Sequence, residues 1–111
     1  MTTAGRIYGC PVELTLSVIG GKWSTVIMAR LKQGDLRYGE LRRLIPTLSD
    51  KMLSQRLREL QEADLVTLVR DAGDNHYSLT ERGAALGPAL WALYEWGEAF
   101  GREKGVRYRD A

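Results

Sequence analysis

The hydrophobic pattern of this chain changes its period past the middle of the sequence and then changes back. In the first half, apolar residues recur every three or four positions, as they do on one face of an α-helix. The stretch 65–69 is then rich in β-branched residues and 76–79 alternates polar and apolar residues, so both are predicted strands. Residues 71–75 between them are turn formers, which predicts a hairpin. From Thr80, a good helix cap, helical spacing returns and continues to about Phe100.

Four helices are predicted before the hairpin, and their ends coincide with glycine or proline in most cases. The expected ranges are 11–19, 22–33, 38–45 and 49–63. The last two are joined by only a few residues around Pro46, which is the length of a helix-turn-helix connection. A hairpin is marginally stable alone and must pack on the helices. A helix-turn-helix followed directly by a hairpin is the plan of a winged helix, so the expected fold is mainly α with one small β-hairpin.

The length of 111 residues suits one domain with a core and is too short for two. We therefore expect a single winged helix-turn-helix domain over 1–111. Its expected parts are the helix-turn-helix at about 37–63, the wing at 65–79 and a dimerisation helix at 80–101. Pro88 is expected to kink or restart that last helix.

The helix over 49–63 has the pattern of a DNA-reading helix. At about 100° per residue, one face gathers apolar side chains that should be buried. These are Leu53, Leu57 and Leu60. The opposite face gathers groups that can bond to base edges in a major groove. These are Lys51, Gln55 and Arg58, with Ser54 at the edge. Base reading is expected from Lys51, Ser54 and Gln55 in the N-terminal half, while Arg58 is suited to phosphate. Any amphipathic helix has a polar outer face, so a merely solvated face is the alternative.

Further polar and basic residues around this helix are candidate DNA contacts. They are Ser49, which is also a good N-cap, Arg37, Arg42 and Arg43 near the preceding helix, and Arg70 and His76 at the base of the wing. The formal net charge is only +2, so a basic footprint must be local. The acidic segment 71–75 would repel phosphate, so the wing tip is expected to contribute little to DNA binding.

The final helix carries more apolar residues than one buried stripe requires. The surplus predicts an isologous homodimer, which would present two reading helices to a near-palindromic site in double-stranded DNA. The predicted interface residues are Leu86, Leu90, Trp91, Leu93, Tyr94, Trp96 and Phe100. One alternative is a helix sunk in its own core. Another is a small-molecule pocket lined by Trp91, Tyr94 and Trp96.

Little in the sequence indicates catalysis or a resident cofactor. His76 is the only histidine, so neither a His-based triad nor a metal cluster has enough members, and no glycine-rich phosphate loop is present. No metal, no cofactor and no enzyme activity are therefore expected. The single cysteine fits a reducing cytoplasm, and neither a secretion signal nor a run long enough to span a membrane is recognisable.

Cys10 precedes Pro11 and is a candidate N-cap of the first helix. A helix N-terminus favours thiolate, whereas the carboxylate of Glu13 opposes it. Cys10 is therefore a candidate redox sensor, which would act through an intersubunit or mixed disulfide because no second cysteine exists. The alternative is a small buried apolar residue.

Several motifs in this order resemble the HxlR-type regulators, relatives of the MarR group. They are Cys10-Pro11, Gly20-Gly21-Lys22-Trp23, Arg37-Tyr38-Gly39-Glu40-Leu41, Leu53-Ser54-Gln55-Arg56-Leu57-Arg58-Glu59-Leu60, Tyr77-Ser78-Leu79-Thr80-Glu81-Arg82-Gly83 and Trp96-Gly97. The resemblance covers about 10–100. It implies a dimeric winged-helix DNA-binding regulator, commonly a repressor, that responds to a redox, electrophile or small-molecule signal. The short acidic wing departs from the family, whose wings are longer and often contain proline. A winged helix that binds another protein instead of DNA is the alternative function.

Overall fold

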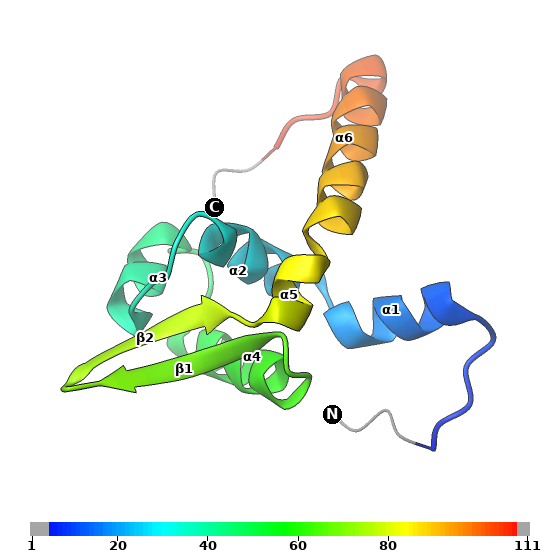
Figure 1. Ribbon diagram of the computed structural model, residues 1–111. Helices are drawn as coiled ribbons and strands as arrows, with labels where there is room; N and C mark the ends of the chain where they lie inside the picture. Colours follow the sequence, from blue (N-terminus) through cyan, green and yellow to red (C-terminus); the bar gives the residue numbers. More distant parts are fainter. Residues whose placement is uncertain (1–4, 109–111) are drawn as a thin grey trace.

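A computed structural model describes residues 5–108, so both ends of the predicted domain, 1–4 and 109–111, lie outside the described part. The elements in chain order are α1 (Pro11–Ile19), α2 (Lys22–Lys32), α3 (Tyr38–Leu44), α4 (Asp50–Glu62), β1 (Val66–Asp71), β2 (Asp74–Leu79), α5 (Glu81–Ala85) and α6 (Gly87–Lys104). Figure 1 shows that α2, α3 and α4 form a body on which the hairpin lies, while α1 and α6 project from it. This is the predicted winged helix-turn-helix fold.

Local signals start and stop the helices. Ser49 caps α4, since its Oγ accepts a hydrogen bond from the Met52 N–H at 3.1 Å. The Glu40 carboxylate accepts from the Arg37 N–H at 2.8 Å and so closes the first turn of α3. Thr80 caps α5 through a 3.0 Å bond from the Gly83 N–H. These caps explain why the predicted helix ranges agree with the observed ones to within one residue at most ends.

The core lies between the body helices and the base of the hairpin. Its buried members are Ile27, Met28, Leu31, Leu41, Ile45, Leu48, Leu53, Leu57, Leu60, Leu65 and Val66. The prediction that the three leucines of α4 are buried is confirmed, since Leu53, Leu57 and Leu60 are each 1% exposed. Turning these leucines to water would cost about 25 cal/mol per Å² of apolar surface exposed. Their burial therefore fixes which face of α4 remains outside.

The hairpin is longer and its turn tighter than the sequence predicted. The strands were expected to end at 69 and restart at 76, yet the ladder pairs Arg70 with Asn75 and Asp71 with Asp74. Only Ala72 and Gly73 form the turn, with φ of 48° and 86°. Two central residues with positive φ match the right-handed twist of paired strands, which stabilises a two-residue turn. The predicted five-residue turn at 71–75 was therefore wrong.

A short segment before α3 also pairs with the wing, which the sequence did not indicate. The Tyr77 N–H donates to Leu36 O at 2.7 Å, and the Leu36 N–H donates to Tyr77 O at 3.1 Å. This pairing covers the outer edge of β2 and ties the wing to the loop between α2 and α3.

Pro88 was predicted either to kink or to restart the last helix, and the structure shows a restart. α5 ends at Ala85, Leu86 caps both helices, and α6 then runs on to Gly105, whose φ of 68° is left-handed. The radius of gyration is 15.0 Å, against about 13 Å for a compact domain of this length. The excess reflects the projecting helices. Among the described residues, no helix is both long and apolar enough to cross a membrane.

Candidate nucleic-acid interface

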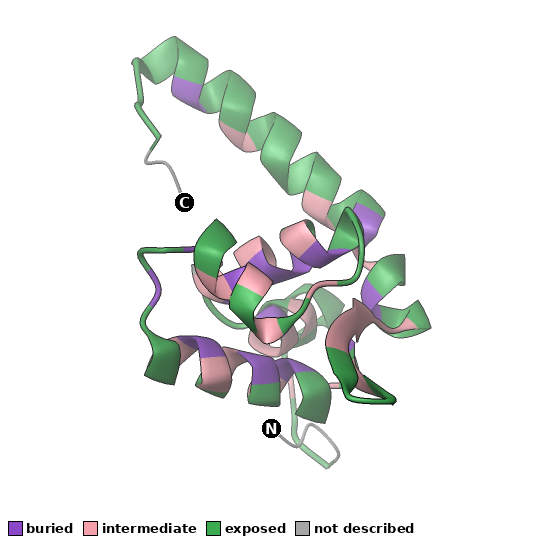
Figure 2. Ribbon diagram, turned by 90° about the vertical axis from the view of Figure 1, so that its left-hand side faces the viewer, coloured by how far each residue is buried: buried purple, intermediate pink, exposed green. Residues whose placement is uncertain are grey.

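The helix-turn-helix consists of α3 and α4, which meet around the buried Ile45 and Leu48 of the connecting turn. Because three leucines hold the inner face of α4 against the body, its outer face is fixed toward solvent (Figure 2). Lys51, Gln55 and Arg58 all lie on this outer face and are exposed. The structure therefore brings together the three residues that the helical periodicity grouped.

The first two of these side chains are free to meet a ligand. Neither Lys51 nor Gln55 takes part in an ion pair or side-chain hydrogen bond within residues 5–108. Arg58 experiences the charge of Glu62, four residues on along the same helix. An ammonium and an amide with no internal partner at the start of the helix retain their full capacity to bond to an acceptor.

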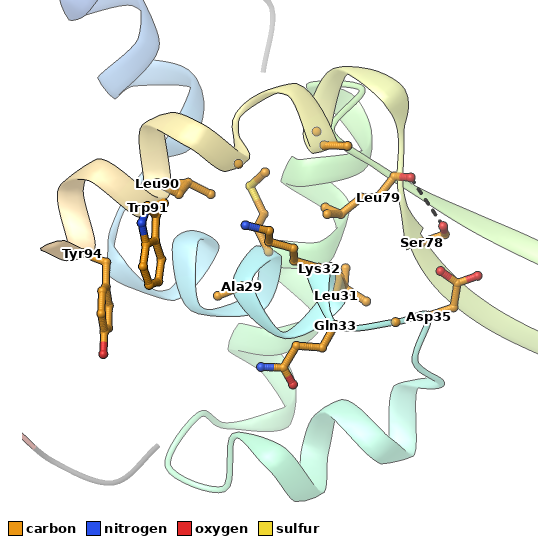
Figure 3. Close-up of a pocket in the computed structure, with 15 residues that line it drawn as sticks. Ala29, Leu31, Lys32, Gln33, Asp35, Ser78, Leu79, Leu90, Trp91 and Tyr94 are labelled. Atoms are coloured by element: carbon orange, nitrogen blue, oxygen red, sulfur yellow. Dashed lines mark hydrogen bonds between the residues drawn. The ribbon is translucent and has the colours of Figure 1, made fainter.

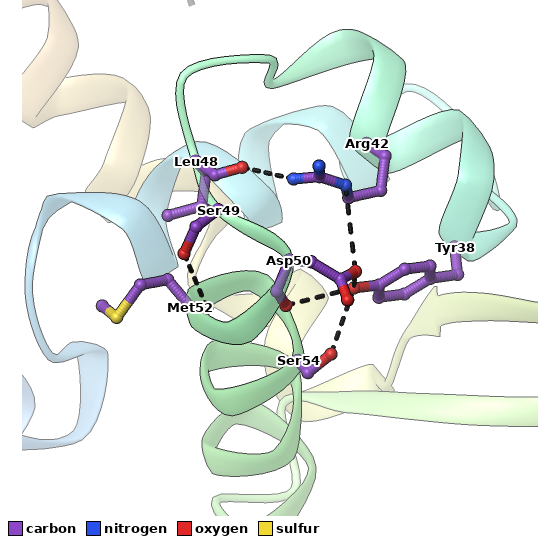
Figure 4. Close-up of polar contacts among 7 residues, drawn as sticks. All are labelled: Tyr38, Arg42, Leu48, Ser49, Asp50, Met52 and Ser54. Carbon is purple, nitrogen blue, oxygen red and sulfur yellow. Dashed lines mark hydrogen bonds and ion pairs between the residues drawn. The ribbon is translucent and has the colours of Figure 1, made fainter.

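A polar cluster joins the two helices at the beginning of α4 (Figure 4). The Tyr38 hydroxyl lies 3.1 Å from Ser54 Oγ and donates to the Asp50 carboxylate. Arg42 approaches the same carboxylate, with Nε and Oδ1 3.9 Å apart, and donates to Leu48 O. Desolvation, followed by the Asp50 hydrogen bond, raises the pKa of Tyr38, which keeps the hydroxyl protonated as a donor.

This cluster changes the interpretation of two predicted DNA contacts. Ser54 and Arg42 were predicted to face DNA, but both are bonded across the helix-turn-helix in the free protein. Their observed contacts set how α4 is seated on α3. Ser49 likewise uses its hydroxyl to cap α4. Tyr38 was not among the predicted site residues, because nothing local in the sequence indicates a hydroxyl–carboxylate contact across twelve positions.

The wing is braced by one ion pair and one histidine–carboxylate contact, which involve other predicted DNA contacts. Arg37 Nε donates to Asp74 Oδ1 at 2.7 Å, and His76 Nε2 lies 3.3 Å from Asp35 Oδ2. The hydrogen bond and charge of Asp74 raise the pKa of the Arg37 guanidinium further above its usual value. The acidic wing tip was expected only to repel phosphate. Asp74 of the tip also holds Arg37, and solvent screens this pair because the two side chains are 64% and 55% exposed.

Besides Lys51, two further predicted cations have no ion-pair partner among residues 5–108. Arg43 and Arg70 are exposed and take part in no ion pair among the residues the structure describes. Arg43 is in the last turn of α3 and Arg70 lies near the end of β1. Arg43 thus belongs to the helix-turn-helix and Arg70 to the wing.

The residues predicted for the dimer interface fall into three groups. Leu86 and Leu90 are half-buried and pack against the core of their own chain. Trp96 stacks on Phe100 with ring centroids 4.9 Å apart, and Leu93 shares their side of α6. Trp91 stacks on Tyr94 at 5.2 Å, and Trp91 is about 140° around the helix from Trp96. Both stacked pairs are exposed, so the alternative of a helix sunk in its own core was wrong.

Cys10 is exposed and occupies the N-cap position of α1 without making a side-chain capping bond. The alternative interpretation of Cys10 as a buried apolar residue was therefore wrong. The Glu13 carboxylate accepts from the Gly9 N–H at 2.6 Å, which directs it to the backbone beside the thiol. Within the described part of the chain, no three His, Cys, Asp or Glu residues are grouped to hold a metal ion.

Comparison with known proteins gives a consistent result. The model of the HxlR-like helix-turn-helix family matches residues 18–105. The chain is 39% identical over 99 residues to an HTH-type transcriptional regulator of Methanothermobacter thermautotrophicus, covering 85% of this chain and 74% of that protein. It is 40% identical over 94 residues to the HTH-type transcriptional regulator YybR of Bacillus subtilis, covering 82% and 75%.

Solved structures share the fold at similar identity. The redox regulator HypR in its reduced form superposes with a TM-score of 0.75 at 38% identity, covering 84% of this chain and 94% of that one. The quinone-bound YodB of Bacillus subtilis superposes with a TM-score of 0.69 at 33% identity, covering 81% and 99%.

Proposed function

This chain belongs to the HxlR-like helix-turn-helix family of transcriptional regulators, and from that membership we propose that it is a homodimeric repressor of a near-palindromic DNA operator. In the proposal, 1–111 acts as one domain in the cytoplasm. Residues 37–63 read DNA and 65–79 form the wing. The predicted dimerisation segment 80–101 covers α5 and most of α6, which runs on to Lys104. Regulators of this family are not enzymes.

One observation carries the DNA-reading part of the proposal. The outer face of α4 presents Lys51 and Gln55 without internal partners, on a helix held by a buried leucine stripe and by the Tyr38–Asp50 contact. Lysine can donate to guanine O6 and N7, and glutamine pairs with adenine N6 and N7. The fixed position of α4 matters because base readout requires its donors to meet a fixed edge of the base pair.

The surrounding residues are assigned to the DNA backbone. Arg43, Arg58 and Arg70 offer cations to phosphates, which position a protein without reading sequence. The other proposed contacts are Ser49, Ser54, Arg37, Arg42 and His76, and for these DNA must compete with the capping bond, hydrogen bonds or ion pairs described above. For Arg37, the exchange replaces one exposed carboxylate partner by a phosphate.

The proposed dimer uses the Leu93, Trp96 and Phe100 side of α6. The other four predicted interface residues are left out of this proposal, because Leu86 and Leu90 pack on their own core and Trp91 and Tyr94 lie on another side of the helix. Trp96 is 67% exposed, and apolar side chains also project from α1, including Val12 and Leu16. Two projecting helices with exposed apolar residues are unusual in a monomer, whereas a second copy would remove both from water. One recognition helix from each copy would then enter successive major grooves.

The test is a gel shift of the purified protein on DNA flanking its own coding region, with excess nonspecific competitor. Lys51→Ala and Gln55→Ala are each expected to remove most of the preference for the specific site, at a cost of about tenfold or more in affinity for it. Gln61→Ala, on an exposed residue farther along α4, is the matched control and should retain the preference. Binding should weaken steeply with salt.

Two outcomes would contradict this assignment. If both variants keep full sequence preference, the reading face is not Lys51 and Gln55. If the folded wild-type protein shifts no DNA at low salt, including a pool of random sequences, the protein-interaction alternative replaces DNA binding.

We further propose that an oxidant signal acts through Cys10, which is exposed. Two Cys10 thiols, one per protomer, would form a disulfide and pass two electrons and two protons to the oxidant. Alternatively, one Cys10 thiol and one small thiol would form a mixed disulfide with the same loss of two electrons and two protons to the oxidant. Diamide, which accepts both electrons and protons, is expected to lower operator affinity of the wild type about tenfold or more, reversibly with dithiothreitol. Cys10→Ser should not respond. An equal response of Cys10→Ser would remove Cys10 from this role.

A further inference from the structure

A groove lies between the end of α2, the end of β2, α5 and the start of α6 (Figure 3). Its volume is about 620 Å³, within the usual range for sites that hold a small molecule. It opens beside the wing and runs to the aromatic pair on α6. Its apolar wall includes Leu31, Leu79, Leu90, Trp91 and Tyr94. None of the assigned DNA contacts lines it.

The groove is open because small residues line it where larger ones would fill it. Ala29, Ala84 and Gly87 all contribute to its walls. A Cβ built on Gly87 would meet only the end of the Lys32 side chain, at 3.7 Å from Nζ. At one end, Trp91 and Tyr94 are nearly parallel, with an interplanar angle of 13°. Because the two rings stack on each other, an outer face of the stack can take a further flat apolar ring.

Lys32 supplies the groove with a positive charge that nothing nearby neutralises. Between residues 5 and 108, no ion pair involves Lys32, although its ammonium lies beside Gly87 at the groove wall. The carboxylate of Asp35 also lines the groove, but it is paired with His76 at 3.3 Å and lies at the end away from the aromatic rings (Figure 3). An anionic group next to the rings would therefore meet a cation without a competing partner.

We propose that this groove binds a flat, apolar molecule with one negative charge, with its ring against Trp91 and Tyr94 and its anionic group on Lys32. These rings lie on the other side of α6 from Leu93, Trp96 and Phe100, so the proposed dimer leaves the groove accessible. Because β2 and α6 both line it, an occupant would contact the wing strand and the dimerisation helix together. An effect of the ligand on DNA binding through these two elements rests on the proposed function, whereas binding of the ligand itself does not require DNA.

The test is a fluorescence titration without DNA. The anionic probe is 8-anilinonaphthalene-1-sulfonate, and the neutral probe of similar shape is N-phenyl-1-naphthylamine. Lys32→Met keeps the apolar stem and removes the charge, so it should weaken the anionic probe about tenfold and leave the neutral probe within about twofold. Lys104→Met, at the far end of α6, is the matched control and should change neither.

A second pair of variants tests the place of binding. Ala84→Phe fills the groove and should weaken both probes about tenfold or more, whereas Ala85→Phe changes the neighbouring exposed residue, which does not line the groove, and should weaken neither. Circular dichroism checks that each variant is folded. If Lys32→Met leaves the anionic probe unchanged, or if Ala84→Phe leaves both unchanged, the proposal is overturned. If the probes bind a monomeric variant but not the dimeric wild type, a second copy covers the groove, and the proposal is overturned as well.

Because these titrations contain no DNA, their failure is distinct from failure of the DNA-binding proposal. If the protein shifts operator DNA but binds neither probe, the proposed DNA-binding function stands and the proposed ligand site is wrong.

Discussion

Trp96→Glu is expected to convert the protein from a dimer into a folded monomer with at least about 100-fold lower affinity for its operator. The Trp96 side chain is 67% exposed in the isolated chain, so its replacement leaves the core intact. In the proposed dimer, the same change buries a carboxylate without a partner, which opposes association strongly. The loss of affinity follows because two linked reading helices bind far more tightly than one.

Light scattering after gel filtration measures the change directly, since one chain has a mass of 12.5 kDa and a dimer twice that. Trp91→Glu is the matched control, because it makes the same substitution on the other side of the same helix. Trp91 is 55% exposed and stacks on Tyr94 rather than on Phe100. A dimeric Trp96→Glu protein, or a monomeric Trp91→Glu protein, would place the interface elsewhere.

The sequence predicted those parts of the fold that depend on neighbouring residues. Ser49, Thr80 and Pro88 act within one or two helical turns, and the helix ends that they define agree with prediction. The burial of one face of α4 also follows from spacing alone. What failed was the hairpin turn, because Ala72 adopts a positive φ that its own preferences do not indicate. The pairing of both strands stabilises that turn.

The sequence could predict which residues share the exposed face of α4, but not the hydrogen bonds and ion pairs around it. Helical periodicity grouped Lys51 with Gln55, and the structure keeps both exposed on one face, with no ion pair or side-chain hydrogen bond to another residue of 5–108. The contacts of Arg37 with Asp74 and of Tyr38 with Asp50 join residues that only the folded chain brings together. A basic residue identified from sequence is therefore a candidate for DNA until its internal partners are known.

Gly83→Ala is expected to destabilise the protein by about 3 kcal/mol or more, although it adds one methyl group. Gly83 is buried in α5, and a Cβ there would lie 2.1 Å from the carbonyl oxygen of Leu65 and 3.0 Å from its carbonyl carbon. That oxygen also accepts from the Thr80 N–H at 3.0 Å, so it cannot move away without breaking the bond that starts α5. Such a loss is a large part of the total stability of a small domain.

Urea unfolding followed by circular dichroism at one fixed protein concentration gives the change in the free energy of unfolding. Gly39→Ala in α3 is the control, because the nearest atom to its added Cβ is the tip of Arg43 at 3.9 Å. There, alanine should stabilise the helix by about 0.5–1 kcal/mol. Opposite signs for the two substitutions would show that backbone contact, and not helix preference, requires glycine at 83. If Gly83→Ala were as stable as the wild type, the close approach of α5 to Leu65 would be wrong. The placement of α6 and of the groove beside it, which both depend on α5, would then need revision.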